Sequence, residues 1–405
     1  FTLGIRLADQ PARIWQTNLW QLASGGRAGQ PVPVTLDRQP GWDQSMGSNG
    51  LRLVRAEGWV LLASGPQRSN NVAKAIARLM QKQSLRPEGL NGWLTLEADL
   101  PLLSAWLPIF RTFPLPPVRL AIMGEGENLR TRGSFQLAKP LPWKFEPWKI
   151  PTNSVDENLV SFTVGQGMET VLKDRKWVKG LGLSKIPNQF VMWGVPAMLS
   201  QTILVAPIED ATNTIRKLAA TAPKVIESLV GPEMGNVLYA SNSATILWQR
   251  FPAISPHIRP LMEAGQEYLM GAMFPLARRT NHPPQELFAQ LAGRTNIAYY
   301  DWEVTEPRIV QARQLFTLQA LINRRKSPSA DLPVEKWLYD LSPLVGNAVT
   351  EVTVTGPKEL SLLRKSQVGL TGFELVSLVR WIDSPGFPLT FELPPRVERP
   401  PPKQP

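Results

Sequence analysis

The sequence contains no cysteine, which excludes disulfide bonds, thiolate catalysis, cysteine-ligated zinc and iron–sulfur clusters. Histidine is nearly absent as well. Neither His257 nor His282 has a second histidine at the spacing of a helical zinc pair. We therefore expect no metal site and no cofactor. Because an oxidising compartment readily tolerates a chain without cysteine, we expect an extracytoplasmic location, in the periplasm or at the cell surface.

Long apolar runs are also missing. No segment approaches the roughly 20 uninterrupted apolar residues of a membrane span, so we expect no transmembrane segment within the chain. The sequence begins at Phe1, directly on an apolar alternation, and this leaves open a signal or anchor upstream of that residue.

Catalytic motifs are absent too. The sequence has no Gly-x-Ser-x-Gly elbow and no Ser-x-x-Lys motif. Gly165-Gln166-Gly167 lacks the third glycine of a dinucleotide fingerprint, and no P-loop lysine follows it. These absences predict a protein that is not an enzyme.

Charge is sparse but one-sided: 19% of the residues are charged and the net charge is +11, which favours anionic polymers or lipid surfaces as partners. The positive residues are scattered, and the densest runs lie at residues 173–179 and at Arg324, Arg325 and Lys326. Both runs are typical of solvated helix ends and loops, and the second is a candidate binding site. Basic residues interleaved with aromatic ones are not clustered, so no specific nucleic-acid partner is expected.

Tryptophan and proline are abundant, with 14 and 39 residues. Large rings fill cores, but tryptophan also forms platforms for sugars or protein partners. Proline removes ladder donors and stiffens the chain, so the Pro/Trp-rich segment 139–157 is expected to be an extended linker. Trp143 and Trp148 in this segment, with Trp302 further along, are candidate binding residues.

Strand–turn–helix units recur along the chain. Period-2 alternation gives way to a helical period after residues 2–7, 92–97, 159–164 and 297–304. Hairpins and longer helices lie between these units, including a long helix expected over residues 259–278. The pattern predicts an α+β fold with two similar halves, each a mostly antiparallel twisted sheet with helices packed on one face. The expected division is a first half at 1–138, the linker at 139–157, a second half at 158–384 and a Pro-rich tail at 385–405.

Asp301 and Glu303 are expected to share one face of the fourth strand, with Trp302 between them. Two neighbouring carboxylates could serve as the catalytic pair of a glycosidase-like hydrolase. An alternating edge strand predicts the same pattern without catalysis.

The repeated units, the Asn158-Leu159-Val160-Ser161-Phe162-Thr163 segment and the strand at residues 346–357 together resemble a family of uncharacterised bacterial proteins, a domain of unknown function. The resemblance spans most of the chain and rests on structural motifs. It implies an extracytoplasmic α+β protein and supplies no catalytic residues. Members often carry an N-terminal signal or anchor, which this sequence does not show.

These observations favour a non-catalytic structural or binding component of the cell envelope or of a larger assembly, with a protein partner or a homo-oligomer. Two alternatives stay open. One is a binding module for an anionic polymer or lipid surface, and the other is a hydrolase that uses Asp301 and Glu303.

Overall fold

The computed structural model describes residues 2–24, 30–46, 49–65, 68–83, 85, 92–98, 116–140, 143–155, 158–173, 175–183, 185–196, 201–230, 236–251, 254–275, 284–322 and 333–384. Arg324, Arg325, Lys326 and the expected tail at 385–405 lie outside these residues. The described residues divide into two compact units: the first comprises the residues up to Ala121 together with residues 380–384, and the second comprises Ile122–Val379. The α+β class is confirmed, with two antiparallel sheets of five and 13 strands.

The first unit is built on the five-stranded sheet, in the order β1-β5-β4-β3-β2. Its elements are β1 (Thr2–Arg6), α1 (Asp9–Ser24), β2 (Val32–Leu36), β3 (Gln39–Met46), β4 (Asn49–Ala56), β5 (Trp59–Ser64) and α2 (Arg68–Met80). Alternation along β4 sends Leu53 into a core with α1 and Val54 into a core with α2. The two helices therefore cover opposite faces of this sheet, whereas the sequence analysis expected helices on one face.

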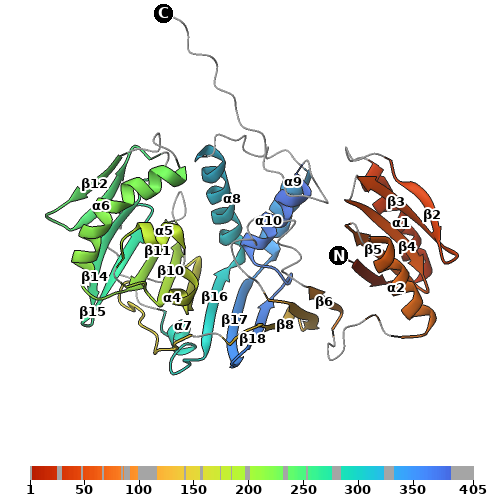
Figure 1. The fold of residues 1–405 in the computed structure, drawn as a ribbon, viewed down its shortest axis with the longest axis horizontal. Helices are drawn as coiled ribbons and strands as arrows, with labels where there is room; N and C mark the ends of the chain where they lie inside the picture. Colours follow the sequence, from red (N-terminus) through yellow and green to blue (C-terminus); the bar gives the residue numbers. More distant parts are fainter. Residues whose placement is uncertain are drawn as a thin grey trace, which may run out of the picture. The chain divides into compact units, whose positions relative to one another are not determined.

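The 13-stranded sheet has the order β12-β13-β14-β15-β11-β10-β9-β16-β17-β18-β8-β7-β6 (Figure 1). Its strands are β6 (Leu94–Ala98), β7 (Val118–Glu125), β8 (Asn128–Gln136), β9 (Ser161–Gln166), β10 (Gln189–Val195), β11 (Gln201–Pro207), β12 (Asn236–Ala240), β13 (Thr245–Gln249), β14 (His257–Glu263), β15 (Gln266–Ala272), β16 (Ile297–Val304), β17 (Asn347–Gly356) and β18 (Glu359–Ser366). The other elements are α4 (Met168–Leu172), α5 (Lys176–Gly180), α6 (Ala211–Val230), α7 (Gln285–Ala289), α8 (Thr305–Ile322), α9 (Pro333–Leu341), the 3₁₀ turn η2 (Ser342–Leu344) and α10 (Gly372–Ile382).

The observed division of the chain differs from the expected one at 138. β8 pairs with β18, where Phe135 lies opposite Leu360, and this pairing places β8 in the sheet of the second unit. Local sequence pattern contains no information about a partner strand more than 200 residues away.

The four helices α6, α8, α9 and α10 cover one face of the large sheet, which we call the helix-covered face. Ile215 and Leu218 of α6 pack on Ile246 of β13, and α8, α9 and α10 share a second apolar cluster around Ile309, Leu338 and Val376 (Figure 1). The helical period of these segments places their apolar residues on one side, which is the side they bury.

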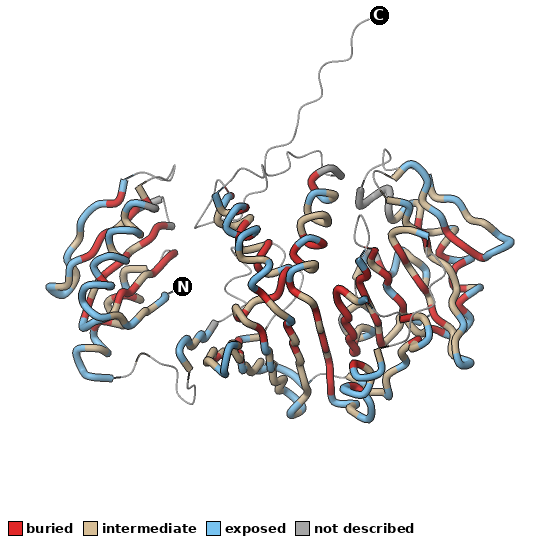
Figure 2. The backbone as a smooth tube through the Cα atoms, turned by 180° about the vertical axis from the view of Figure 1, so that it is seen from behind, coloured by how far each residue is buried: buried red, intermediate tan, exposed pale blue. Residues whose placement is uncertain are grey.

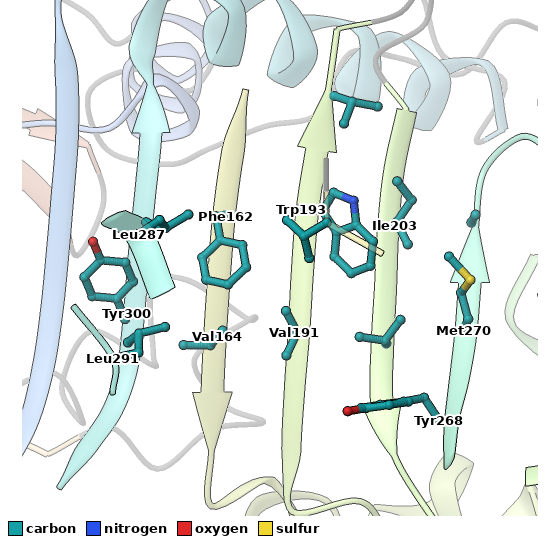
Figure 3. Close-up of a cluster of buried hydrophobic side chains, with 14 of the residues drawn as sticks. Phe162, Val164, Val191, Trp193, Ile203, Tyr268, Met270, Leu287, Leu291 and Tyr300 are labelled. Atoms are coloured by element: carbon teal, nitrogen blue, oxygen red, sulfur yellow. The ribbon is translucent and has the colours of Figure 1, made fainter. Parts of the chain in front are cut away.

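The opposite face carries the largest core. Phe162, Val164, Val191, Trp193 and Tyr300 project from neighbouring strands, and Leu287 and Leu291 cover them from α7 and the turn after it (Figure 3). The buried residues of the sheet concentrate along its strands (Figure 2).

A segment at residues 143–155, which we call the strap, also lies on this face. Its Trp148 and Ile150 pack against the core. The strap has no regular secondary structure, in agreement with the extended conformation expected from its prolines. It packs on the sheet of the second unit as part of that unit.

The long helix expected over residues 259–278 is wrong. Residues 259–272 form most of β14 and all of β15, joined by a tight turn at Ala264 and Gly265, both with positive φ (50° and 78°), and residues 276–278 lie outside the described residues. Pro260, which would interrupt a helix, is tolerated in β14 because the pairing of that strand with β13 involves only His257 and Ile258.

Candidate functional site

Trp302, one of the candidate binding residues, lines a cavity of about 370 Å³ on the strap-covered face of the sheet. It projects from β16, where it lies opposite Phe162 of β9 and Val349 of β17. Strand alternation places it on the face opposite Asp301 and Glu303, so the three residues do not form one site.

Apolar and polar side chains together line the cavity. Its lining comprises Trp302, Leu159, Leu287, Pro284, Asn158, Glu286 and Gln290. Among the described residues of this lining, Glu286 is the single ionisable side chain, and it lies exposed on α7. A volume of this size lies within the range of pockets that hold a small molecule or a large side chain.

The wall formed by α7 is firmly attached to the sheet. The Tyr300 hydroxyl donates a hydrogen bond to Oε1 of Gln290 at 2.5 Å, and burial raises the pKa of Tyr300 to about 12, so the hydroxyl keeps its proton. Leu287 and Leu291 anchor the same segment in the core. The cavity is therefore preformed between two elements that cannot easily separate.

Trp143 and Trp148 lie elsewhere and have packing roles. Nε1 of Trp148 donates to the Arg294 carbonyl at 3.2 Å, and its ring packs on the core. The Trp143 ring packs on Phe145 and lies 3.0 Å from the position of a Cβ at Gly167, whose φ of 86° favours glycine. Neither indole belongs to the lining of the Trp302 cavity.

The strap is held by two glutamines that the sequence analysis did not single out. Gln166 and Gln189 lie opposite each other in β9 and β10. Oε1 of Gln166 accepts from the Glu146 amide at 3.2 Å, and Oε1 of Gln189 accepts from the Lys149 amide at 3.0 Å. Side-chain amides thus replace the strand partner that the proline-rich strap lacks. Only the pairing of β9 with β10 reveals this role.

A second cavity, of about 320 Å³, opens beside the strap. It is lined by three lysines and three glutamates, Lys144, Lys149, Lys185, Glu146, Glu169 and Glu209, together with uncharged residues. Lys185 pairs with Glu209 at 2.9 Å and Lys149 with Glu146 at 3.9 Å. Because the charges balance, this cavity offers an anionic ligand no net attraction.

Asp301 and Glu303 share the helix-covered face of β16, with 6% and 1% of their surface exposed. Oδ1 of Asp301 accepts from the Thr163 hydroxyl at 2.6 Å, and Oε1 of Glu303 accepts from the Gly372 amide at 2.6 Å. Neither carboxylate lines either of the two cavities. A hydrolase needs both groups in an accessible cleft, whereas these oxygens are occupied by the protein itself.

The carboxylates belong to a buried polar layer between the sheet and the helices. Nε of Arg308 on α8 lies 3.5 Å from Glu303, and its Nη1 donates to the Ser161 hydroxyl at 3.0 Å. Arg308 also bonds Oε1 of Gln311, whose Nε2 donates to the Thr202 hydroxyl at 2.8 Å. Burial raises the pKa of Asp301, and it raises the pKa of Glu303 to about 7. The layer links β9, β11 and β16 to α8 and α10.

The described residues include no group of three or more histidine, aspartate or glutamate side chains that could hold a metal ion. Among those residues no helix has the length and apolar character needed to cross a membrane.

No family model matches the chain, and a comparison with curated proteins finds no match. A solved structure titled "Structure of crystal form I of TP0453" aligns with 59% of this chain and with all of its own chain, at 8% identity and a TM-score of 0.27. A likeness this weak supports no argument about fold or function. The resemblance to an uncharacterised bacterial family stays a prediction.

Proposed function

We propose that the protein is a non-catalytic binding component of a larger assembly at the cell envelope, and that a partner protein inserts an apolar side chain into the Trp302 cavity. The observation that carries this proposal is the placement of Trp302 in a preformed cavity that combines apolar walls with polar groups.

This arrangement is similar to that of a hot spot in a protein–protein interface. Such hot spots combine a desolvated aromatic residue with surrounding polar groups that exclude water. Trp302 is partly buried and comes from the middle of the sheet, so little conformational entropy is lost when a partner contacts it. The described residues of the lining include one ionisable group and therefore no acid–base pair, which favours binding over catalysis.

The experiment is gentle extraction of the complex from its source, followed by light scattering and identification of the co-purifying chains. A mass well above 45.1 kDa is expected. Affinity for the identified partner is then measured for Trp302→Ala and for Glu286→Arg, which adds bulk and positive charge at an exposed position. We expect each to weaken binding about tenfold or more, as for an interface anchor.

Trp93→Ala is the matched control, because Trp93 is 77% exposed and lies outside the cavity. Binding that survives both cavity variants would contradict the proposal. If that binding also collapses with added salt, the anionic polymer or lipid alternative, supported by the net charge of +11, takes its place.

A further inference from the structure

β12 forms one edge of the large sheet, and its sequence is Asn-Val-Leu-Tyr-Ala, with neither a charged residue nor a proline. Its pairing with β13 is continuous over all five residues, from Asn236 opposite Gln249 to Ala240 opposite Thr245, without a bulge. The outer side of this strand therefore presents backbone groups in the geometry that another strand would use.

The other three sheet edges in the described residues carry protection against strand addition. β2 contains Pro33, β1 ends in the exposed Arg6, and β6 contains Glu97, which pairs with Arg119 at 2.9 Å. Proline and charge are the common devices that prevent edge-to-edge pairing. β12 is the edge of these four that lacks both.

Apolar side chains occupy both faces of β12. Val237 and Tyr239 pack against the cluster under α6, which holds the strand in place. Leu238 points to the other face, where it is 44% exposed and lies opposite Leu247 of β13. The edge is thus rigid, apolar and accessible.

We propose that β12 pairs antiparallel with β12 of a second copy of this chain, about a two-fold axis at Leu238. If α6 lies on the same face of the joined sheet in both copies, full overlap of the five residues places Leu238 opposite Leu238 of the second copy. Val237 then lies opposite Tyr239 of the second copy, which gives two pairs of an aromatic and a β-branched residue, a favourable cross-strand combination. β12 itself contains no charged residue that would repel the same strand of a second copy. This inference does not depend on the proposed function of the Trp302 cavity.

The absence of cysteine makes a direct test possible, because a single introduced cysteine is the only thiol in the protein. Across the proposed axis, the Cβ atoms at position 238 lie about 5 Å apart. Those at position 236 are separated by four residues along the strand, about 13 Å. After mild oxidation of the full chain, Leu238→Cys is therefore expected to form a covalent dimer in much higher yield than Asn236→Cys.

Leu363→Cys is the control for random collision, because Leu363 is 40% exposed but belongs to β18 in the interior of the sheet. In parallel, light scattering over about a hundredfold range of concentration follows the native mass. The wild type is expected to rise from 45.1 kDa toward about twice that value. Leu238→Lys, which places two like charges opposite each other, is expected to stay monomeric.

Three results would overturn the inference. One is a wild-type mass that stays at 45.1 kDa over the whole range, and another is growth beyond twice that mass, which indicates open-ended pairing. The third is equal cross-linking at positions 236, 238 and 363, which indicates collision without a fixed register.

Discussion

The pKa of the Glu303 side chain depends strongly on the groups around it. Burial under α10 raises the pKa of its carboxyl, the Gly372 amide lowers it, nearby Asp301 raises it and Arg308 lowers it, with a result of about 7. The unfolded chain has an ordinary glutamate there, with a pKa near 4.5. Protonation of this residue is therefore coupled to folding.

The direction in which stability changes with pH follows from the number of protons that Glu303 binds in the folded and in the unfolded state. Between about pH 4.5 and 7 the folded state holds a proton that the unfolded state has lost, so the free energy of unfolding falls as pH rises through this window. Glu303→Gln keeps an acceptor for the Gly372 amide and removes the titration. We expect a shallower decline in stability across the window, measured by urea unfolding at a series of pH values. Glu127→Gln, at an exposed turn position, is the control, and an unchanged slope in Glu303→Gln would contradict this assignment.

Sequence alternation predicted that Asp301 and Glu303 share a face, and the register of β16 confirms it. It did not predict what covers that face. Burial of the carboxylates depends on α8 and α10 packing there, and the pairing of Thr163 with Asp301 joins residues 138 positions apart. Trp302 was identified from its residue type, but its cavity requires α7 and Leu159, which local pattern does not bring together.

At the scale of elements, the strap is the segment for which expectation and structure differ most: the sequence predicted a linker between two halves, and the structure shows a segment packed on the second unit. Its extended conformation follows from its prolines, but its packing on the second unit does not. Replacement of Trp143 and Trp148 would loosen the two halves if the segment were a linker, whereas the structure predicts a local loss of stability.

Trp148→Ala is therefore expected to lower the stability of the second unit by about 2–3 kcal/mol, at or below the lower end for a large aromatic core residue because the ring is only partly buried. Urea unfolding measures the change, and limited proteolysis should show faster cleavage within residues 143–155. Trp93→Ala, at an exposed position, should change neither. Unaltered stability in Trp148→Ala would show that the strap is not held by this ring.

Turn chemistry explains which hairpins the sequence analysis missed. The turn between β2 and β3 uses Asp37 and Arg38, both with positive φ (49° and 64°) and without a glycine. Such a turn lacks the Asn-Gly or Asp-Gly signal of a tight hairpin. Gly356-Pro357-Lys358, in contrast, carries a strong turn signal in the sequence, and the β17–β18 hairpin forms there.

At the scale of the whole molecule, each unit has an apolar core of its own. Leu53 is fully buried in the first unit, and Ile215 is fully buried in the second. Separate cores predict separate cooperative transitions. The sequence predicted two sheets from its recurring units, but their unequal sizes depend on long-range pairing of β8 with β18.

We expect calorimetry of the full chain to resolve two transitions. Leu53→Ala should lower one of them, with a loss of about 2–5 kcal/mol, and Ile215→Ala should lower the other. If either substitution moves both transitions together, the units unfold as one.

The position of β16 between β9 and β17 has a consequence for biosynthesis. β9 and β10 leave the ribosome early, but the strand that completes the other side of β9 is made more than 100 residues later. Until then the nascent chain presents an unpaired apolar strand, the kind of surface that chaperones protect. The centre of the sheet, where Phe162 lies opposite Trp302, therefore closes only after β16 has been made.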